Sequence, residues 1–211
     1  MNSKIKICGL TRECDIDYVN EANPEYIGFV FAKSKRQIDE KGAAFLKSKT
    51  KSTITAVGVF VNAPREQVAG LLKSGTIDAV QLHGQEEPSY VEEIKKLTGC
   101  PVIKAVRIGE EEYPASFFEE YRNAGADYFL FDSGVSGGGQ CYGGTGVTFD
   151  WKRIPEVPMP YFLAGGLNAE NIREAASYAV PYAVDISSGV ETGGVKDRDK
   201  ILEIIRRVRD V

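Results

Sequence analysis

Short apolar segments alternate along the chain with longer segments whose apolar positions are spaced for helices. The short segments are rich in Val, Ile, Phe and Ala and cover residues 4–8, 26–31, 56–61, 79–83, 102–106, 128–132, 161–164 and 183–187. They recur about every 25 residues, the spacing that one strand and one helix require in a (β/α)8 barrel. Strands that are apolar on both faces are typical of a parallel sheet covered by helices. The pattern predicts an α/β fold, a (β/α)8 TIM barrel, built as a single domain from residues 1–211.

The helical half of this repeat is clearest near the end of the chain, where residues 201, 204, 205 and 208 are apolar at helical spacing. Residues 64–73 form a second predicted helix, with a proline at its start. A third is predicted over residues 168–178, with Asn168 as its N-cap and Glu170 in its first turn. The sixth helix, around residues 149–154, is the weakest, because prolines at 155, 158 and 160 leave little room for it.

One segment is too polar and too glycine-rich to belong to a core. It covers residues 133–146 between two strand–helix units, and loops of this length are usually functional or disordered. We expect it to form a lid over the mouth of the barrel. A doubly wound open sheet is the structural alternative, but no dinucleotide-type Gly-x-Gly-x-x-Gly follows the first strand.

The composition is that of an ordinary globular protein, with 43% hydrophobic and 27% charged residues. The net charge of -4 argues against a nucleic-acid partner, which would need a basic face. No apolar run approaches the roughly 18 residues of a membrane span. The chain enters its first strand without the apolar region of a signal peptide. We therefore expect a cytoplasmic protein with neither a nucleic-acid nor a membrane partner.

The cysteines indicate neither a disulfide scaffold nor a metal site. There are four, Cys8, Cys14, Cys100 and Cys141, none in a Cys-x-x-Cys pair, and the chain has one histidine. We expect free thiols and no structural metal. Cys14, Cys100 and Cys141 are interpreted as a helix residue, a residue before a strand proline and a loop residue.

Two loops late in the chain are candidates for phosphate binding. Gly165 and Gly166 follow the seventh strand, and Ser187, Ser188 and Gly189 follow the eighth. In (β/α)8 barrels these two positions commonly hold a phosphate, because glycines let backbone N–H groups approach the anion and serine hydroxyls donate to it. Each glycine alone could equally be an ordinary turn residue.

Two titratable residues end strands at the catalytic face that the fold predicts. Cys8 closes the first strand and Asp132 closes the sixth. A buried apolar thiol and a loop-capping carboxylate are the alternative interpretations. Together they would form the acid/base pair of an isomerase. As a base, Cys8 would need an electropositive setting that lowers its pKa from about 8.5.

Three further polar residues are candidates for contacts with a substrate. Arg36 follows the second strand, and its guanidinium can bind a carboxylate through two hydrogen bonds. His83 ends the fourth strand and could act as a base or as a neutral hydrogen-bonding group. Asp185, inside the eighth strand, could accept a hydrogen bond from a sugar hydroxyl or organise its neighbouring loops.

The chain resembles a known family in segments that run in order over nearly its whole length. They are Lys6-Ile-Cys-Gly-Leu-Thr11, Gly28-Phe-Val-Phe31 with Ser34 and Arg36, Val57-Gly-Val-Phe-Val-Asn62, Gln81-Leu-His-Gly84, Gly143-Gly-Thr-Gly146, Phe149-Asp-Trp151, Ala164-Gly-Gly-Leu-Asn168 and Asp185-Ile-Ser-Ser-Gly-Val-Glu191. These segments are similar to those of the phosphoribosylanthranilate isomerases of tryptophan biosynthesis. The segment between Asp132 and Gly143, which carries Cys141, departs from the family pattern.

The resemblance implies an aldose–ketose isomerase that performs an Amadori rearrangement on a small phosphorylated substrate without a cofactor or metal. It implies that Cys8 is the general base, Asp132 the general acid and Arg36 the ligand of the anthranilate carboxylate. His83 and Asp185 would lie near the sugar, and the loops with Gly165, Gly166, Ser187, Ser188 and Gly189 would hold the phosphate. Either a monomer or a homodimer is compatible with the sequence.

Two other functions compete with this one. The histidine-pathway aminoaldose isomerase performs the same rearrangement on a bis-phosphate, but the segments 60–62 and 82–84 lack a second glycine or serine–glycine pair for its second phosphate. A phosphate-ligand-binding barrel without catalysis is the second alternative, and such a protein would need neither Cys8 nor Asp132.

Overall fold

The computed structural model describes residues 3–109, 112–133, 148–157 and 159–210. Its strands are β1 (Lys4–Cys8), β2 (Tyr26–Val30), β3 (Thr55–Phe60), β4 (Ala79–Leu82), β5 (Val102–Ile108), β6 (Tyr128–Ser133), β7 (Tyr161–Leu163) and β8 (Ala183–Ile186). Each strand pairs in parallel with the next, and β8 pairs with β1, which closes the sheet into a barrel. The predicted (β/α)8 fold is confirmed.

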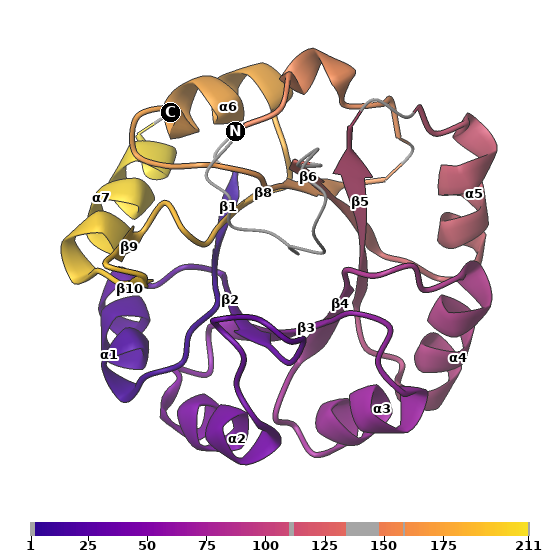
Figure 1. Ribbon diagram of the computed structural model, residues 1–211, viewed down its shortest axis with the longest axis horizontal. Helices are drawn as coiled ribbons and strands as arrows, with labels where there is room; N and C mark the ends of the chain where they lie inside the picture. The colour runs from indigo at the N-terminus through magenta and orange to yellow at the C-terminus, as the bar shows by residue number, and fades with distance from the viewer. Residues whose placement is uncertain (1–2, 110–111, 134–147, 158, 211) are drawn as a thin grey trace.

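A ring of helices surrounds the barrel (Figure 1). They are α1 (Glu13–Ala22), α2 (Glu40–Lys49), α3 (Arg65–Lys73), α4 (Pro88–Thr98), α5 (Ala115–Asn123), α6 (Ile172–Ala179) and α7 (Arg198–Arg209). The large hydrophobic cluster lies between sheet and helices, and the predicted apolar face of α7 belongs to it. Helix α3 begins directly after Pro64, as the sequence predicts, because proline needs no N–H partner at a helix start.

The sixth and the last repeats differ from the regular pattern. A single 3-10 turn, η1 (Trp151–Arg153), occupies the position of the sixth helix, consistent with the prolines that follow it. After β8 the chain forms a hairpin of β9 (Glu191–Thr192) and β10 (Val195–Lys196) before α7 begins. The predicted lid over residues 133–146, with Cys141, lies outside the described residues except for Ser133.

The helix after β7 begins three residues later than predicted. Ile172 is the first residue of α6, and Asn171 takes the N-cap position predicted for Asn168. Asn168 closes the preceding turn: its side-chain oxygen accepts hydrogen bonds from the backbone N–H groups of Glu170 and Asn171, and its carbonyl oxygen accepts one from Ile172. Asn168 is also bridged to Gly189 in the loop after β8.

Side chains of alternate strand residues fill the interior of the barrel. The lower part is apolar and contains Val57, Ala79, Ile103, Leu130, Phe162 and Ala183, among others. Because a strand repeats every two residues, the same interior face continues upward through β1, β4, β6 and β8 to polar side chains. The interior is therefore polar at the carboxyl ends of the strands and apolar at the opposite end.

Candidate active site

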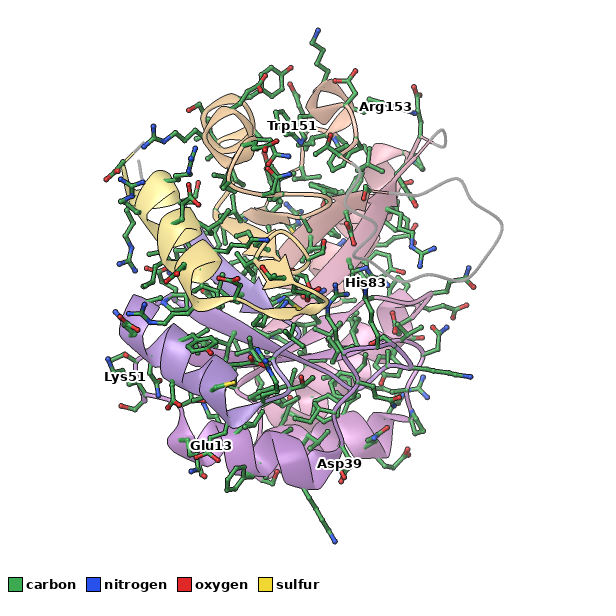
Figure 2. The ribbon with its side chains drawn as sticks, turned by 60° about the vertical axis from the view of Figure 1, so that its left-hand side comes forward. Glu13, Asp39, Lys51, His83, Trp151 and Arg153 are labelled. Carbon is green, nitrogen blue, oxygen red and sulfur yellow. The ribbon has the colours of Figure 1, made fainter. Side chains whose placement is uncertain are left out.

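Most of the predicted site residues meet in one cavity at the carboxyl ends of the strands. The cavity opens to solvent. Nine of the ten predicted residues line it: Cys8, Arg36, His83, Asp132, Gly165, Gly166, Asp185, Ser187 and Ser188. Figure 2 shows labelled His83 well inside the outline, whereas labelled Glu13 and Asp39 lie near the lower edge. Gly189 lies behind the cavity lining, where the two late loops touch.

Cys8 sits in a tight recess between strands. Gly28 on β2 makes room for it, because a Cβ at that position would lie 2.6 Å from the Cys8 Sγ. Burial raises the pKa of the thiol; the positive charges of Lys6 and Lys196 oppose this rise without cancelling it. Lys6 and Lys196 supply the electropositive setting that Cys8 would need as a base, but burial outweighs their charges and the Cys8 pKa is raised overall.

Asp132 and His83 face each other across the cavity. Nε2 of His83 lies 3.3 Å from Oδ2 of Asp132. The other carboxylate oxygen of Asp132 accepts a hydrogen bond of 2.8 Å from the backbone N–H of Ser133. Asp132 is only 6% exposed, so its carboxyl group opens to the cavity and to little else.

Arg36 binds a carboxylate of the protein itself. Its Nε and one terminal nitrogen donate to the two oxygens of Glu191, at 2.6 Å and 2.9 Å. Lys196 donates to the same carboxylate at 2.8 Å. Burial alone would raise the pKa of Glu191, but Arg36 and Lys196 outweigh it, and the pKa is lowered. Glu191 thus stays charged and holds the guanidinium in place at the cavity wall.

The two late loops form one joined surface. Gly165 and Gly166 both have positive φ, 87° and 63°, which brings the backbone to the cavity edge in a conformation that side chains disfavour. Gly189 packs directly on the carbonyl oxygen of Leu167, so any Cβ there would overlap that atom. The Ser187 hydroxyl donates to the carbonyl oxygen of Cys8 at 3.0 Å. This bond connects the candidate phosphate-binding loop after β8 to the end of β1.

A charged pair is buried under this surface. Nζ of Lys6 lies 2.8 Å from Oδ2 of Asp185, and Lys6 has no exposed surface. Burial would lower the pKa of Lys6, but the charge of Asp185 and other neighbours raise it overall. The other carboxylate oxygen of Asp185 has no hydrogen-bond partner among the described residues, and Asp185 lines the cavity. That oxygen is itself buried, so a polar group would have to enter the wall of the cavity to reach it.

Four charged or polar residues of the site were not predicted: Lys6, Gln81, Glu191 and Lys196. Lys6 and Gln81 stand two residues before Cys8 and His83, so the strand repeat places them on the same interior face. That signal was present in the sequence. Glu191 and Lys196 reach Arg36 and Ser187 from the β9–β10 hairpin, for which the strand–helix pattern holds no signal.

The described residues contain no group of three or more His, Cys, Asp or Glu side chains placed to hold a metal ion. Within the same ranges, no helix combines the length and the apolarity needed to cross a membrane. The arrangement can hold anions at Arg36 and at the late loops, and it sets a thiol and a carboxyl group in one cavity. The protein is thus a (β/α)8 barrel with glycine-bearing loops after β7 and β8, where such barrels commonly bind phosphate.

Comparisons with known proteins give the family. The family model described as N-(5'-phosphoribosyl)anthranilate (PRA) isomerase matches residues 5–207. The N-(5'-phosphoribosyl)anthranilate isomerase of Endomicrobium trichonymphae is 48% identical over 208 residues, which are 99% of each chain. The phosphoribosyl anthranilate isomerase structure from Thermus thermophilus has a TM-score of 0.83 and 29% identity, with 98% of each chain covered. The chain belongs to the N-(5'-phosphoribosyl)anthranilate isomerase family.

A further solved structure of this family contains a ligand. It is a phosphoribosyl anthranilate isomerase in complex with reduced 1-(o-carboxyphenylamino)-1-deoxyribulose 5-phosphate, with a TM-score of 0.78 and 32% identity. The comparison covers 99% of this chain and all of that one.

Proposed function

We propose that this protein converts N-(5'-phosphoribosyl)anthranilate to 1-(2-carboxyphenylamino)-1-deoxyribulose 5-phosphate with Cys8 as general base and Asp132 as general acid. As a member of its family, the protein is an aldose–ketose isomerase of tryptophan biosynthesis. The proposal assigns the steps of that reaction to particular side chains. The observation that carries it is that Cys8 and Asp132 end different strands yet line the same cavity.

Two proton transfers of the reaction are assigned to side chains, and the reaction needs no external oxidant or reductant. Asp132 donates a proton to the ring oxygen of the ribose, the ring opens, and a Schiff base forms between C1 and the anthranilate nitrogen. Cys8, as thiolate, removes the proton from C2, and the resulting enolamine tautomerises to the ketose. The oxidation of C2 balances the reduction of C1 within one molecule, so acid–base groups suffice.

Two anion sites would hold the substrate by its ends. Arg36, held in place by Glu191, binds the anthranilate carboxylate with its remaining N–H groups. The loops with Gly165, Gly166, Ser187 and Ser188 bind the phosphate, and Gly189 keeps those loops joined.

The ribose would then lie between the two ends, beside His83 and the free oxygen of Asp185. The relative solved with the reduced carboxyphenylamino deoxyribulose phosphate supports a ligand of this shape in such a barrel.

The test is the turnover of phosphoribosylanthranilate by Cys8→Ala and Asp132→Asn. Loss of a positioned acid or base should lower kcat by about 10²- to 10⁴-fold. Binding of the reduced product analogue, measured by calorimetry, should persist. Cys14→Ala and Asp17→Asn on α1 are matched controls outside the cavity, and both should retain full turnover.

Near-normal turnover in either active-site variant would remove its assigned role. A folded wild type that leaves phosphoribosylanthranilate unchanged but binds phosphate would be a non-catalytic barrel. Conversion of the histidine-pathway aminoaldose instead would favour the other isomerase.

We further propose that the protein works in the cytoplasm on this small phosphorylated molecule, as a monomer or a homodimer, without a nucleic-acid partner. One relative, from Thermotoga maritima, is described as a dimeric phosphoribosylanthranilate isomerase from which monomers were generated. Light scattering of the purified protein distinguishes the two.

A further inference from the structure

A row of polar side chains crosses the barrel interior from β8 to β6, and two of them, Lys6 and Gln81, have no role assigned so far. Lys6 Nζ donates to Asp185 Oδ2 at 2.8 Å and to Gln81 Oε1 at 2.9 Å. Gln81 Nε2 lies 2.8 Å from His83 Nδ1. Nε2 of His83 lies 3.3 Å from Asp132 Oδ2. Lys6, Gln81, Asp132 and Asp185 are all buried, so water does not compete freely for these bonds.

The direction of each bond follows from Lys6. A lysine ammonium group has three donors and no acceptor. The Asp185 charge keeps this buried amine protonated, in agreement with its raised pKa. The Gln81 atom that faces Lys6 must therefore be the carbonyl oxygen. The other end of the amide, which faces His83, must be the NH₂ group, a donor only.

The orientation of Gln81 then determines where His83 carries its proton. Because the amide NH₂ donates, Nδ1 must accept through its lone pair. A neutral imidazole with a bare Nδ1 carries its hydrogen on Nε2. Nε2 lies 3.3 Å from Oδ2 of Asp132, within reach of that carboxyl group. An imidazolium would set an N–H on Nδ1 against the amide N–H groups of Gln81, so this arrangement disfavours the charged ring.

We propose that Lys6 and Gln81 are positioning residues that hold His83 neutral, with its proton on Nε2, as a hydrogen-bond donor to Asp132. His83 in this arrangement neither takes up a proton nor releases one during turnover. It orients the Asp132 carboxyl group, and the proton that leaves this side of the cavity belongs to Asp132 alone. The consequence for turnover rests on the function proposed above for Asp132; the state of the ring does not.

His83 is the one histidine of the protein, so every imidazole signal in a spectrum belongs to it. Long-range ¹H–¹⁵N correlation spectra of ¹⁵N-labelled, ligand-free protein distinguish pyrrole-type from pyridine-type ring nitrogens. For the wild type at neutral pH we expect Nε2 to be pyrrole-type and Nδ1 pyridine-type. An Nδ1–H ring or an imidazolium in the wild type would overturn the proposal.

Gln81→Glu replaces the group that donates to Nδ1 of His83 by one that accepts from it. A carboxylate at position 81 can still accept from Lys6, but it also accepts from an Nδ1–H group, so we expect His83 to become imidazolium between two carboxylates. Gln67→Glu adds the same charge at a half-buried position on α3, outside the cavity, and should leave the ring signals unchanged. An unchanged spectrum for Gln81→Glu would also overturn the proposal.

A second variant covers the case in which the added charge prevents folding. Gln81→Met keeps the length of the side chain and removes the donor, so the ring should populate both neutral tautomers. Retention of a pure Nε2–H ring in this variant would mean that Gln81 does not set the tautomer.

Kinetics complete the test. We expect kcat of Gln81→Glu to fall by about tenfold or more and its pH profile to change, with Gln67→Glu unaffected. If the ring changes state and turnover does not, the positioning role is wrong while the roles of Cys8 and Asp132 stand. If Cys8→Ala and Asp132→Asn retain turnover, the proposed function fails, and the spectra still decide the state of His83.

Discussion

Arg36 is held in a fixed orientation by another residue of the site, Glu191. Glu191 binds two of its nitrogens, and the Glu191 carboxylate is only 6% exposed. A guanidinium has five donors, so donors remain for a substrate carboxylate after Glu191 is satisfied. Glu191 therefore fixes the orientation of the Arg36 guanidinium and does not use up the N–H groups that a substrate carboxylate would bind.

Replacing Glu191 with Gln should weaken substrate binding more than catalysis. The amide cannot accept from both nitrogens of Arg36, so the guanidinium loses its fixed orientation. A hydrogen bond to a charged group contributes about 1.5–3 kcal/mol, so we expect KM to rise about tenfold or more with a smaller change in kcat. Steady-state kinetics measure both constants.

The control for this substitution is Glu203→Gln on α7, which removes a partly exposed ion pair with Arg207. Exposed pairs contribute little, so both kinetic constants should stay unchanged. If Glu191→Gln lowers kcat at constant KM, Glu191 acts on the chemistry and our account of Arg36 is wrong.

The Cys8 thiol should be slow to react in the empty site at neutral pH. Its pKa is raised by burial, so the thiolate forms only at a pH above the ordinary value of about 8.5. In a protein whose other three cysteines are replaced by Ser, alkylation by iodoacetamide should accelerate as the pH rises through this range. The rate of alkylation against pH gives the titration directly.

Lys196 should influence that titration. Its positive charge lowers the Cys8 pKa, so Lys196→Met should move the acceleration to still higher pH. Lys152→Met, at an exposed position of η1, should not move it. Alkylation at full rate already at neutral pH would contradict the burial of the thiol.

The residues that a sequence can place at the site are those that end strands. Cys8 and Asp132 were predicted in this way, since a regular repeat fixes where each strand closes. Lys6 and Gln81 follow from the same repeat one layer deeper, but their polar groups lie inside strands that are otherwise apolar. Glu191 could not be found, because its contact with Arg36 spans 155 residues and depends on the hairpin.

At the scale of elements, the loops after β7 and β8 act as one unit. Gly189 touches the carbonyl oxygen of Leu167, and the adjacent Asn168 is bridged to Gly189. A side chain at position 189 would force the loops apart. We expect Gly189→Ala to lower the affinity for inorganic phosphate by about tenfold and to lower stability by about 1–3 kcal/mol.

A matched glycine lies on helix α3. A Cβ at Gly70 would meet no atom within 4 Å, so Gly70→Ala should leave phosphate binding unchanged and stabilise the helix by about 1 kcal/mol. Phosphate titration by calorimetry and urea unfolding measure both variants. Equal behaviour of the two variants would mean that the two loops are not coupled.

The elements themselves were largely predictable, and the exceptions have tertiary causes. All eight strands lie within about two residues of the predicted segments, because burial on both faces leaves a strong apolar signal. The start of α6 was misplaced because the turn that Asn168 closes, which is bridged to Gly189, precedes the regular helix. The β9–β10 hairpin is too short to leave a strand pattern.

At the scale of the whole molecule, the two ends of the barrel have different functions: one carries the candidate active site and the other the apolar packing. The carboxyl ends of the strands carry Cys8, His83 and Asp132, whereas the opposite end is filled by aromatic rings around Phe162. Tyr26 and Tyr128 lie with their ring centroids 5.3 Å and 5.5 Å from the Phe162 ring. Substitutions at the two ends should therefore affect different properties.

Phe162→Ala should destabilise the protein without altering its chemistry. The side chain is fully buried, and removal of a buried phenyl ring costs about 3–5 kcal/mol. We expect the urea midpoint to fall accordingly while KM and kcat, measured well below the unfolding temperature, stay within about twofold. Phe45→Ala, at a position that is 51% exposed, should shift the unfolding free energy by no more than about 0.5 kcal/mol. A large loss of kcat in folded Phe162→Ala would show that the aromatic end and the catalytic end are coupled, and that barrel packing itself sets the geometry of the site.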